Sequence, residues 1–346
     1  MYRIGINGLG RIGRAILRSN LEKNLFEIAV INDLNPDVAN LAYTLNYDTV
    51  YGRLNNQFSY SSQSISQEGK DPINIFQEDS ISNVPWHEFD LDYVIDSSGI
   101  HKNVLDSRKL IDEGKLKKIF ITHSPKEVDF TMILGVNELN YKNNKHNLIS
   151  SSICDATAIS PTLNDINKKF GINSGSITTA HPWLSYQNLT DGPSSSWSVP
   201  GEVYHHFALG RSVIGNIIPK PTTAVEVSCS VLDDLSEDMF ISFSYRTPTA
   251  IVGSADLTLN LSNHTSTAEV VEYFKFLEKN QTFSIYKNNF EPLVSLDFIK
   301  ADFSCIVDHR WTEVRNGNLL KLILWYDNEW GYSNKVLDQI NYISNL

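Results

Sequence analysis

A glycine-rich turn near the N-terminus constrains this chain more than any other feature. The turn Gly8-Leu-Gly10-Arg-Ile-Gly13 follows a short apolar run at residues 2–6 and opens a segment at residues 11–22, whose apolar side chains recur at helical spacing. Such glycines permit a tight turn, close approach of the backbone to a pyrophosphate, and packing of the helix against the strand. The helix start adds amide donors and a favourable dipole for an anion. Strand, turn and helix in this order predict a dinucleotide-binding site; the alternative is a glycine-rich turn without a ligand.

An acidic residue after the next strand refines this prediction. Residues 26–31 form a second apolar run, and Asp33 follows it, about twenty residues after Gly13. At this place in dinucleotide-binding folds a carboxylate binds the hydroxyls of the adenosine ribose and disfavours a 2′-phosphate. We therefore expect NAD rather than NADP as the cofactor.

The pattern of the chain changes at about residue 154. Before it, strand-like runs at 93–95 and 118–121 flank a helix-like run at 103–113, which predicts a parallel sheet covered on both faces. After it, one helix at about 155–170 is followed by β-like stretches at 175–181, 223–232, 239–245, 251–261 and 319–326. We therefore expect an α/β protein with an N-terminal Rossmann dinucleotide-binding domain and an α+β catalytic domain with a mixed sheet.

The length of the chain and its polar segments suggest where these domains begin and end. A chain of 346 residues is long enough for two domains, which we place at residues 1–153 and 154–332. Residues 54–70 are rich in Asn, Ser and Gln and indicate a surface excursion. Residues 188–206 form a long polar loop, of a kind that is usually functional or disordered. Residues 333–343 have helical apolar spacing.

The charge and cysteine content narrow the class of protein. The formal net charge of -11 argues against a general nucleic-acid surface or an anionic membrane as partner, since both call for basic patches. Three cysteines fit a reducing compartment better than a disulfide framework. The first residues look like a strand and not a signal peptide, and no apolar run reaches the roughly 18 residues of a membrane span. We expect a cytoplasmic protein without a metal site.

Cys154 and His181 form the candidate catalytic pair. Cys154 lies at the first turn of the helix expected at 155–170, where amides and the helix dipole favour a thiolate, and Gly171 is a natural C-cap for that helix. His181 ends the following strand and can act as base and then acid on a substrate oxygen. Thiol, imidazole and NAD together indicate oxidation of an aldehyde through a covalent thioester. The alternative is a small buried thiol, the interpretation we give to Cys229 and Cys305 in their strand-like runs.

Motifs spread over nearly the whole chain resemble the glyceraldehyde-3-phosphate dehydrogenase family. Besides the glycine turn and the interval from Cys154 to His181, the matching motifs are Ile31-Asn-Asp33, Tyr47-Asp48, Leu134-Gly-Val-Asn137, Asp191-Gly-Pro193, Asn216-Ile-Ile-Pro219, Arg246-Thr-Pro-Thr249 and Trp325-Tyr-Asp-Asn-Glu-Trp-Gly-Tyr-Ser-Asn334. The last of these is highly specific. The resemblance implies the family's two-domain fold, with a C-terminal helix at 333–346 completing the first domain, and a homotetramer.

The resemblance also implies a mechanism. Cys154 would attack the aldehyde carbon, and the thiohemiacetal would give hydride to NAD with help from His181. Phosphate, or sometimes water, would then release the acyl group. The implied cofactor contacts are Asn7, Gly8, Gly10, Arg11, Ile12 and Gly13 at the pyrophosphate turn, Asp33 at the ribose, Ser97, Asn328 on the nicotinamide carboxamide, and Tyr332 near the ring. The alternatives are that Asn328 is an ordinary turn residue and Tyr332 a core aromatic.

The chain departs from the family around the substrate. The family usually reads Ser-Cys-Thr-Thr-Asn at the nucleophile, and this chain reads Ile153-Cys154-Asp155-Ala-Thr157. The two threonines that hold the substrate phosphate in the family correspond to Leu184 and Tyr186. The family's Ser-Ser-Thr-Gly, which helps to hold inorganic phosphate, is Lys220-Pro-Thr222-Thr223. Thr222 remains, as does Arg246, which serves both anion sites in the family.

These departures predict a changed substrate. Leu184 and Tyr186 remove at least one hydroxyl donor and add bulk. The negative charge of Asp155 would repel phosphate and raise the pKa of the Cys154 thiol. Lys220 would partly offset that charge if its side chain points inward. We expect Asp155, Leu184, Tyr186, Thr222 and Arg246 to contact the substrate of an NAD-dependent aldehyde dehydrogenase retargeted to another small or sugar-derived aldehyde. The alternatives are an ordinary phosphorylating glyceraldehyde-3-phosphate dehydrogenase and a non-catalytic NAD-binding or scaffold protein.

The long loop at 194–210 carries the aromatic and imidazole side chains that would shape such a pocket. They are Trp197, Tyr204, His205 and His206. The sequence leaves open whether this loop alters the tetramer. It also leaves open whether phosphate, water or another acceptor takes the acyl group.

Overall fold

A computed structural model describes residues 1–194 and 206–346, and it divides the chain into two compact units. The first unit comprises Met1–Met132, Asn140–Ser152 and Val336–Leu346, and the second comprises Ile133–Leu139 and Ile153–Lys335. The segment Ile133–Leu139 precedes the boundary expected from the sequence and belongs to the second unit. Trp197, Tyr204 and His205 lie outside the described residues.

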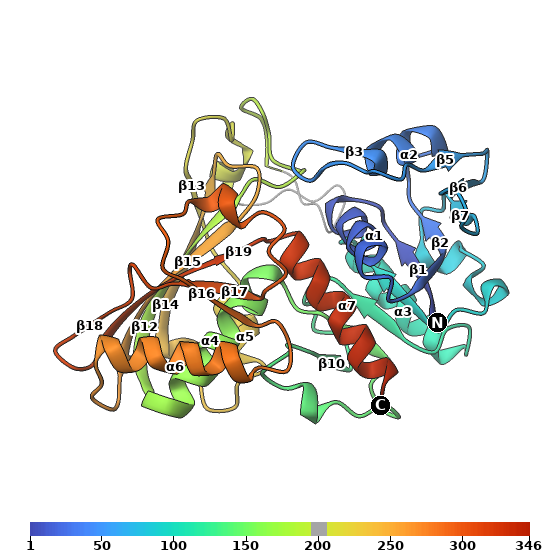
Figure 1. The fold of residues 1–346 in the computed structure, drawn as a ribbon. Helices are drawn as coiled ribbons and strands as arrows, with labels where there is room; N and C mark the ends of the chain where they lie inside the picture. Colours follow the sequence, from blue (N-terminus) through green and yellow to red (C-terminus); the bar gives the residue numbers. More distant parts are fainter. Residues whose placement is uncertain (195–205) are drawn as a thin grey trace. The chain divides into compact units, whose positions relative to one another are not determined.

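The first unit is built on a nine-stranded sheet whose central part is parallel (Figure 1). The strand order is β10-β11-β9-β8-β1-β2-β7-β6-β5. The strands are β1 (Arg3–Asn7), β2 (Glu27–Asn32), β5 (Ser59–Tyr60), β6 (Ser64–Ser66), β7 (Ile73–Phe76), β8 (Tyr93–Asp96), β9 (Ile119–Ile121), β10 (Phe130–Thr131) and β11 (Leu148–Ser150). The order on either side of β1 follows opposite directions along the sequence, which makes β1 the switch point of the sheet. The predicted Rossmann arrangement is confirmed.

Four helices accompany this sheet. They are α1 (Arg11–Lys23), α2 (Val38–Asn46), α3 (His101–Asp112) and the C-terminal part of α7 (Trp330–Ser344), and β3 (Tyr47–Asp48) pairs with β4 (Gly52–Arg53) in a separate hairpin. The helices predicted at 11–22, 103–113 and 333–343 are confirmed with small shifts of their ends. Residues 54–70 are more than a surface excursion, because β5 and β6 extend the sheet and Ile65 is fully buried.

The second unit is built on an eight-stranded mixed sheet. The order is β13-β14-β12-β15-β19-β17-β16, with β18 paired to β19. The strands are β12 (Ile172–Pro182), β13 (Ile218–Lys220), β14 (Phe240–Thr247), β15 (Gly253–Leu261), β16 (Tyr286–Asn289), β17 (Cys305–Asp308), β18 (Glu313–Arg315) and β19 (Leu319–Tyr326). Pairs β12–β14 and β16–β17 are parallel and the others antiparallel, so the predicted α+β unit with a mixed sheet is confirmed.

One predicted strand of this unit is wrong. Within residues 223–232 the structure has the helix α5 (Ala224–Cys229), so Cys229 is helical and not in a strand. The valine-rich sequence favours a strand locally. Packing overrides that preference, because Ala224, Val225, Val227 and Ser228 are buried and the Ser160 hydroxyl of α4 (Cys154–Phe170) donates to Ser228 at 2.8 Å.

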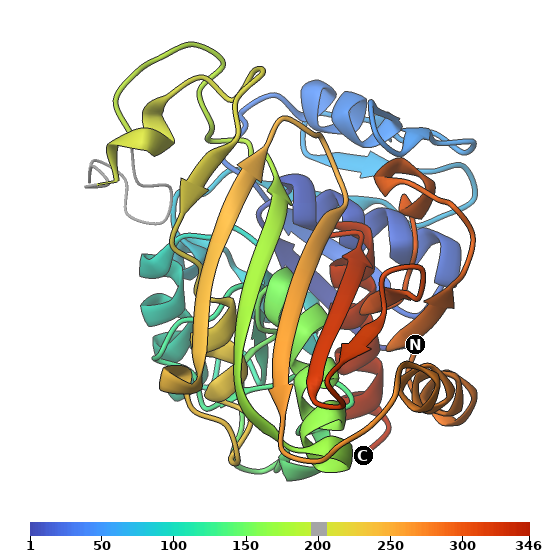
Figure 2. The same ribbon diagram turned by 90° about the vertical axis from the view of Figure 1, so that its left-hand side faces the viewer.

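Helices cover one face of the second sheet and leave the other open. Figure 2 shows the open face toward the viewer, with the green helix α4 behind the strands and α6 (Thr267–Asn280) at one edge. In α4, most residues from Asp155 to Phe170 are buried, and the helix ends at Gly171, where a Cβ would lie 2.7 Å from Ser262. Within residues 1–194 and 206–346, none of the helices is long and apolar enough to cross a bilayer.

Candidate active site

Cys154 is the first residue of α4, where the chain turns from an extended segment into the helix. Ile153 precedes it as N-cap in extended conformation and offers no side-chain hydrogen bond to the first turn. Ile153 and Ala156 pack with Ile133 and Val227 in a small apolar cluster. This packing fixes the start of the helix, and with it the Cys154 thiol, which lies beside the carboxyl end of β12.

His181 is aimed at Cys154 by the register of β12. Its Nε2 lies 3.4 Å from Cys154 Sγ. In the parallel pair β12–β14, His181 stands opposite Arg246, and the Arg246 side chain is buried beside the imidazole. The predicted pair Cys154–His181 is therefore together in the structure.

Two neighbours of His181 Nδ1 select opposite tautomers of the ring. The Pro182 carbonyl oxygen lies 2.8 Å from Nδ1, and Arg246 Nη1 lies 2.5 Å from the same atom. A carbonyl only accepts and a guanidinium only donates. Nδ1–H toward Pro182 leaves the Nε2 lone pair facing the thiol, whereas acceptance from Arg246 places the hydrogen on Nε2. The site therefore supports both forms of the imidazole.

Asp155 completes a compact cluster with this pair. Its Oδ1 lies 3.6 Å from Cys154 Sγ and 3.9 Å from His181 Nε2. The Tyr326 hydroxyl donates to the same oxygen at 2.8 Å. Tyr326 ends β19 opposite Gly253 of β15, where a Cβ would stand 2.7 Å from the Tyr326 ring. A glycine at 253 thus makes room for the ring that orients Asp155.

Burial and the Asp155 charge set the protonation of the cluster. They raise the pKa of the Cys154 thiol well above its ordinary value, burial acting most strongly, and Arg246 opposes them. Burial also lowers the pKa of His181 to about 4, against the influence of Asp155. At neutral pH the pair is a neutral thiol beside a neutral imidazole. The expectation that Asp155 raises the thiol pKa is confirmed, whereas the thiolate expected from the helix start does not prevail.

The other predicted substrate contacts lie in the same unit, and one of them, Tyr186, joins the cluster through Arg246. The Tyr186 hydroxyl accepts a hydrogen bond from Arg246 Nη2 at 3.4 Å, and Arg246 Nε has no hydrogen-bond partner among the described residues. Thr222 Oγ1 accepts from the Ala224 amide at 3.2 Å and thereby precedes α5. Leu184 is half-buried in the turn after β12, where its carbonyl accepts from the Gln187 amide.

Lys220 is a further cation near the cluster. Burial lowers the pKa of its ammonium, and Arg246 acts in the same direction. The negative charge of Asp155 raises that pKa, so the two groups are near enough to interact. From the sequence, Lys220 is expected to offset the charge of Asp155 only if it points inward. No role is expected for Tyr326, although it lies in the most specific motif of the chain.

The glycine turn of the first unit has the geometry of an anion cradle. Gly8 has φ +92°, and a Cβ there would lie 2.7 Å from the Ser98 amide nitrogen. A Cβ on Gly13 would lie 2.1 Å from the Gly8 carbonyl oxygen. A Cβ on Gly10 would meet open space within 4 Å, and Gly10, as the N-cap of α1, has no side chain with which to cap the first turn. An anion could therefore approach the backbone of the helix start closely.

The polar residues around this turn are held by one another. Asn7 donates to Asp96 at 2.9 Å and accepts from Asn32 at 2.8 Å, which ties β1 to both of its neighbours. The Ser97 hydroxyl donates to the Gly8 carbonyl at 2.6 Å. Asp33 accepts from the Leu9 amide at 2.6 Å, and so joins the end of β2 to the turn.

Arg11 and Ile12, the two residues after Gly10, differ in their surroundings. Arg11 forms an ion pair with Asp48, with part of its side chain exposed. Ile12 is half-buried at the start of α1. Both belong to the first helical turn, as the sequence predicts.

Asn328 and Tyr332 are buried in the second unit. Asn328 is 4% exposed, and its Oδ1 has no hydrogen-bond partner among the described residues. Tyr332 lies in α7, and burial, followed by the Cys154 charge, raises the pKa of its phenol well above the ordinary value. Tyr332 is therefore both buried and close enough to Cys154 to sense its charge.

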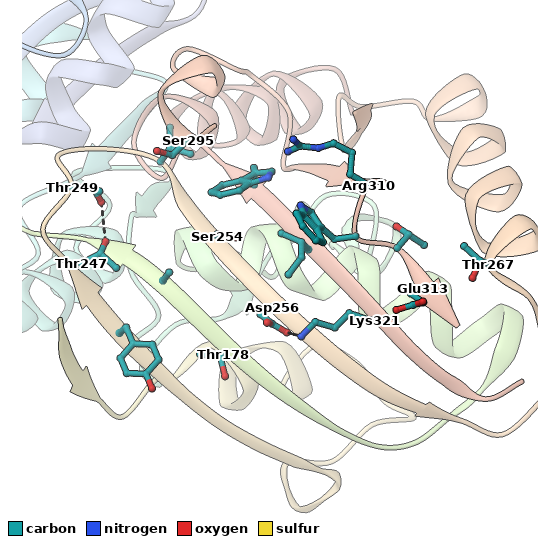
Figure 3. Close-up of a pocket in the computed structure, with 17 residues that line it drawn as sticks. Thr178, Thr247, Thr249, Ser254, Asp256, Thr267, Ser295, Arg310, Glu313 and Lys321 are labelled. Atoms are coloured by element: carbon teal, nitrogen blue, oxygen red, sulfur yellow. Dashed lines mark hydrogen bonds and ion pairs between the residues drawn. The ribbon is translucent and has the colours of Figure 1, made fainter. Parts of the chain in front are cut away.

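A separate groove lies on the open face of the second sheet (Figure 3). Thr178 and Ala180 of β12 line it, together with Tyr245, Trp311 and the ion pair Asp256–Lys321. Residues alternate faces along a strand, so His181 points away from the groove that Ala180 lines. The groove and the cluster at Cys154 therefore lie on opposite faces of the same sheet.

Comparison with known proteins decides the family. The family model "Glyceraldehyde 3-phosphate dehydrogenase, NAD binding domain" matches residues 2–104, and the model "Glyceraldehyde 3-phosphate dehydrogenase, C-terminal domain" matches residues 153–328. The chain is 35% identical to glyceraldehyde-3-phosphate dehydrogenase 2 of Streptomyces avermitilis, over 99% of this chain and 98% of that protein. It belongs to the glyceraldehyde-3-phosphate dehydrogenase family.

Other relatives agree with this assignment. Glyceraldehyde-3-phosphate dehydrogenase 1 of Bacillus cereus is 34% identical over 99% of each chain. The cytosolic glyceraldehyde-3-phosphate dehydrogenase of Gracilaria gracilis is 33% identical over 99% of this chain and 98% of its own. The chain is thus an oxidoreductase of this family with NAD as its cofactor, and the resemblance and the cofactor predicted from the sequence are confirmed.

Proposed function

We propose that this member of the glyceraldehyde-3-phosphate dehydrogenase family oxidises an aldehyde through a covalent acyl-thioester on Cys154. The observation that carries the proposal is the contact of Cys154 Sγ with His181 Nε2 at 3.4 Å, beside a buried guanidinium. We further propose that its substrate is another small or sugar-derived aldehyde and not glyceraldehyde 3-phosphate.

His181 supplies the proton transfers of this chemistry. With Nδ1–H on the Pro182 carbonyl, Nε2 takes the thiol proton as Sγ bonds to the aldehyde carbon. The protonated ring then gives this proton to the oxygen of the thiohemiacetal. The neutral ring takes the proton back from that hydroxyl group as hydride leaves the carbon and the thioester forms. Because the pKa of His181 is about 4, the imidazole is neutral and ready to accept a proton at neutral pH.

The residues present fit NAD in each unit. In the first unit, the start of α1 and the open space at Gly10 suit a pyrophosphate, and we assign Asn7, Gly8, Arg11, Ile12, Gly13 and Ser97 to that turn and Asp33 to the ribose. In the second unit, the unpartnered buried Oδ1 of Asn328 suits a carboxamide N–H, and we assign Tyr332 to the same ring. The chemistry that NAD supplies when bound is acceptance of the hydride.

The change of substrate is supported by the side chains around Arg246. Arg246 Nη2 is engaged by the Tyr186 hydroxyl, at a position where the family usually has a threonine for the substrate phosphate. Asp155 places a carboxylate next to the nucleophile, where it repels a phosphate. We assign Leu184, Thr222 and the retained Nε of Arg246 to the remaining substrate contacts.

A specific observation favours the ordinary phosphorylating reaction as the second candidate. The relatives described above are named glyceraldehyde-3-phosphate dehydrogenases and align with nearly the whole chain. A non-catalytic NAD-binding or scaffold role is the third, and the intact contact between Cys154 and His181 argues against it.

An assay of the purified protein distinguishes these three candidate functions. The protein is mixed with NAD and each of a panel of aldehydes, with and without phosphate, and turnover is followed by the absorbance of NADH. We expect turnover with a small or sugar-derived aldehyde to exceed that with glyceraldehyde 3-phosphate. Fast, phosphate-dependent turnover of glyceraldehyde 3-phosphate would establish the second candidate instead. No turnover with any aldehyde would favour the third.

Two sets of variants sharpen this experiment. Cys154→Ser should abolish turnover and keep NAD binding, whereas Cys229→Ser in α5 should keep both, and full activity of Cys154→Ser would refute the covalent mechanism. Leu184→Thr combined with Tyr186→Thr should improve glyceraldehyde 3-phosphate relative to the preferred aldehyde. An unchanged ratio in that double variant would show that these positions do not select the substrate.

We also propose a homotetramer in the cytoplasm, with residues 1–153 and the C-terminal helix serving NAD and residues 154–332 serving catalysis. The open sheet face supports self-association, because Trp311 is 59% exposed and Tyr245 is 37% exposed beside it. Analytical ultracentrifugation should give four chains per particle, and Trp311→Glu should reduce that number. A monomer in the unmodified protein would overturn the assembly.

A further inference from the structure

We propose that Cys154, Asp155 and His181 form a reversible binding site for a tetrahedral divalent cation, best matched by Zn²⁺. The three side chains offer a thiolate, a carboxylate and an imidazole, whose donor atoms all lie within 4.8 Å of one another. No metal site is expected from the sequence, and the cluster is formed only where β12 brings His181 to the start of α4. The inference does not depend on which aldehyde the enzyme oxidises.

The spacing of the donor atoms matches a tetrahedral ion. Sγ lies 3.4 Å from Nε2 and 3.6 Å from Oδ1, and Nε2 lies 3.9 Å from Oδ1. Zinc bonds of about 2.0–2.3 Å at tetrahedral angles place such donors about 3.4–3.6 Å apart. Two of the three distances already agree, and the third closes with a movement of about half an ångström.

The surroundings hold two of the ligands in place. Tyr326 donates to Asp155 at 2.8 Å and fixes the carboxylate. The Pro182 carbonyl, 2.8 Å from His181 Nδ1, supports the one of the two tautomers whose Nε2 lone pair faces Sγ, and metal binding would favour that tautomer over the one that accepts from Arg246. A carbonyl on the far nitrogen of a metal-binding histidine is a common supporting contact in metal sites.

The donor set selects the kind of cation. Thiolate and imidazole favour Zn²⁺ and disfavour Mg²⁺ and Ca²⁺, which prefer oxygen ligands. On binding, the thiol proton leaves to solvent, and thiolate and carboxylate then balance the two charges of the ion. Arg246 and Lys220 stand near the cluster and oppose the cation, so we expect weaker binding than in a closed four-ligand structural site.

Asp155 is what distinguishes this cluster from its counterpart in the family. At that position the family usually has a threonine, which leaves a cysteine and a histidine alone. The third ligand converts a two-ligand contact into a three-ligand site with one open position, which is the coordination that zinc has in catalytic sites. A thiolate bound to the ion cannot attack an aldehyde, so the metal would act as a reversible inhibitor of this enzyme.

The test uses the full-length protein, reduced and freed of metal with a chelator. Titration with Zn²⁺ in equilibrium dialysis should saturate at one equivalent per chain. Titration with Co²⁺ should give the thiolate-to-cobalt charge-transfer band and the intense visible bands of a tetrahedral ion. Asp155→Thr and Asp155→Asn should each raise the Zn²⁺ dissociation constant at least about tenfold, since even loss of a supporting contact typically costs that much.

Cys229→Ser provides the matched control, because Cys229 is the other partly exposed free thiol. It should leave the affinity and the Co²⁺ spectrum unchanged. Equal Zn²⁺ affinity in the Asp155 variants, loss of binding in Cys229→Ser, or an octahedral Co²⁺ spectrum would each overturn the proposal.

Protection of the thiol gives a second measurement that needs no variant. Peptide mapping after iodoacetamide treatment should show Zn²⁺ shielding Cys154 and leaving Cys229 open to alkylation. Alkylation of Cys154 at the same rate with and without saturating Zn²⁺ would contradict the proposal. Both measurements are made without NAD or aldehyde, so their failure leaves the proposed dehydrogenase reaction untouched.

Discussion

Asp155→Asn should make the Cys154 thiol more reactive, because it removes the negative charge nearest to the sulfur. Oδ1 and Sγ are 3.6 Å apart. At that distance two unit charges repel by about 1 kcal/mol in a water-like medium and by about 5 kcal/mol at an effective dielectric constant near 20. Relief of this repulsion raises the thiolate fraction at pH 7 by about sevenfold at the lower limit and more than a thousandfold at the upper.

The gain in alkylation rate is smaller than the gain in thiolate. A less basic thiolate is a weaker nucleophile, and roughly half of the logarithmic gain is retained. We therefore expect the iodoacetamide rate of Cys154 at pH 7, in metal-free buffer, to rise between about 3-fold and about 50-fold. The assay is the second-order rate of alkylation followed by peptide mapping, measured across a range of pH.

Asp165→Asn is the matched control for this prediction. Asp165 lies further along the same helix, where its carboxylate accepts from the Tyr286 hydroxyl at 2.6 Å. The same substitution there tests for a general effect on α4 and should leave the alkylation rate of Cys154 unchanged. A folded, NAD-binding Asp155→Asn protein whose thiol reacts no faster than the unmodified one would refute the electrostatic reasoning.

The remaining predictions concern NAD binding at the glycine turn, the packing of α4 and the stability of the protein in acid. Gly13→Ala should abolish NAD binding in isothermal titration, because its Cβ would lie 2.1 Å from the Gly8 carbonyl oxygen, and retained affinity would show that the turn can move aside. Leu163→Ala should lower the free energy of unfolding by about 2–5 kcal/mol in urea titration, since Leu163 is fully buried in α4, and a loss below that range would mean that the site collapses around the cavity. Acidification should also destabilise the protein through His309, whose pKa burial lowers from 6.5 to about 4. The unfolded chain binds this proton more readily, so the contribution is complete above pH 6.5 and is lost as the pH falls toward 4. His309→Gln should reduce this acid-induced loss by up to about 3 kcal/mol, and an unchanged pH dependence in chemical denaturation would contradict the assignment.

Local patterns in the sequence were enough to predict the elements that carry the candidate residues. The glycine turn, the helix after Cys154 and the strand ending at His181 each depend on neighbours in sequence, and all three are in the structure. The sequence of α5 favours a strand instead, because its valines have high strand propensity, and the helix depends on packing against α4.

Contacts between distant strands could not be predicted in this way. The hydrogen bond from Tyr326 to Asp155 joins residues that are far apart in sequence, and it depends on the pairing of Gly253 with Tyr326. The sequence shows a carboxylate beside the thiol but not the ring that orients it. For the same reason it places Arg246 at an anion site without revealing its contact with the His181 ring.

The two faces of β12 set a strict limit on changes of chain length. Ala180 lines the open groove, and the adjacent His181 faces Cys154 on the other side of the sheet. A strand that slips by one residue exchanges its faces. One inserted or deleted residue between the register shift at Ile172/Ser174 and His181 would therefore turn the imidazole to the face of the groove. An insertion would bring Ala180 to the thiol, and a deletion would bring Pro182. The length of this strand is thus as necessary to the site as the side chains that it carries.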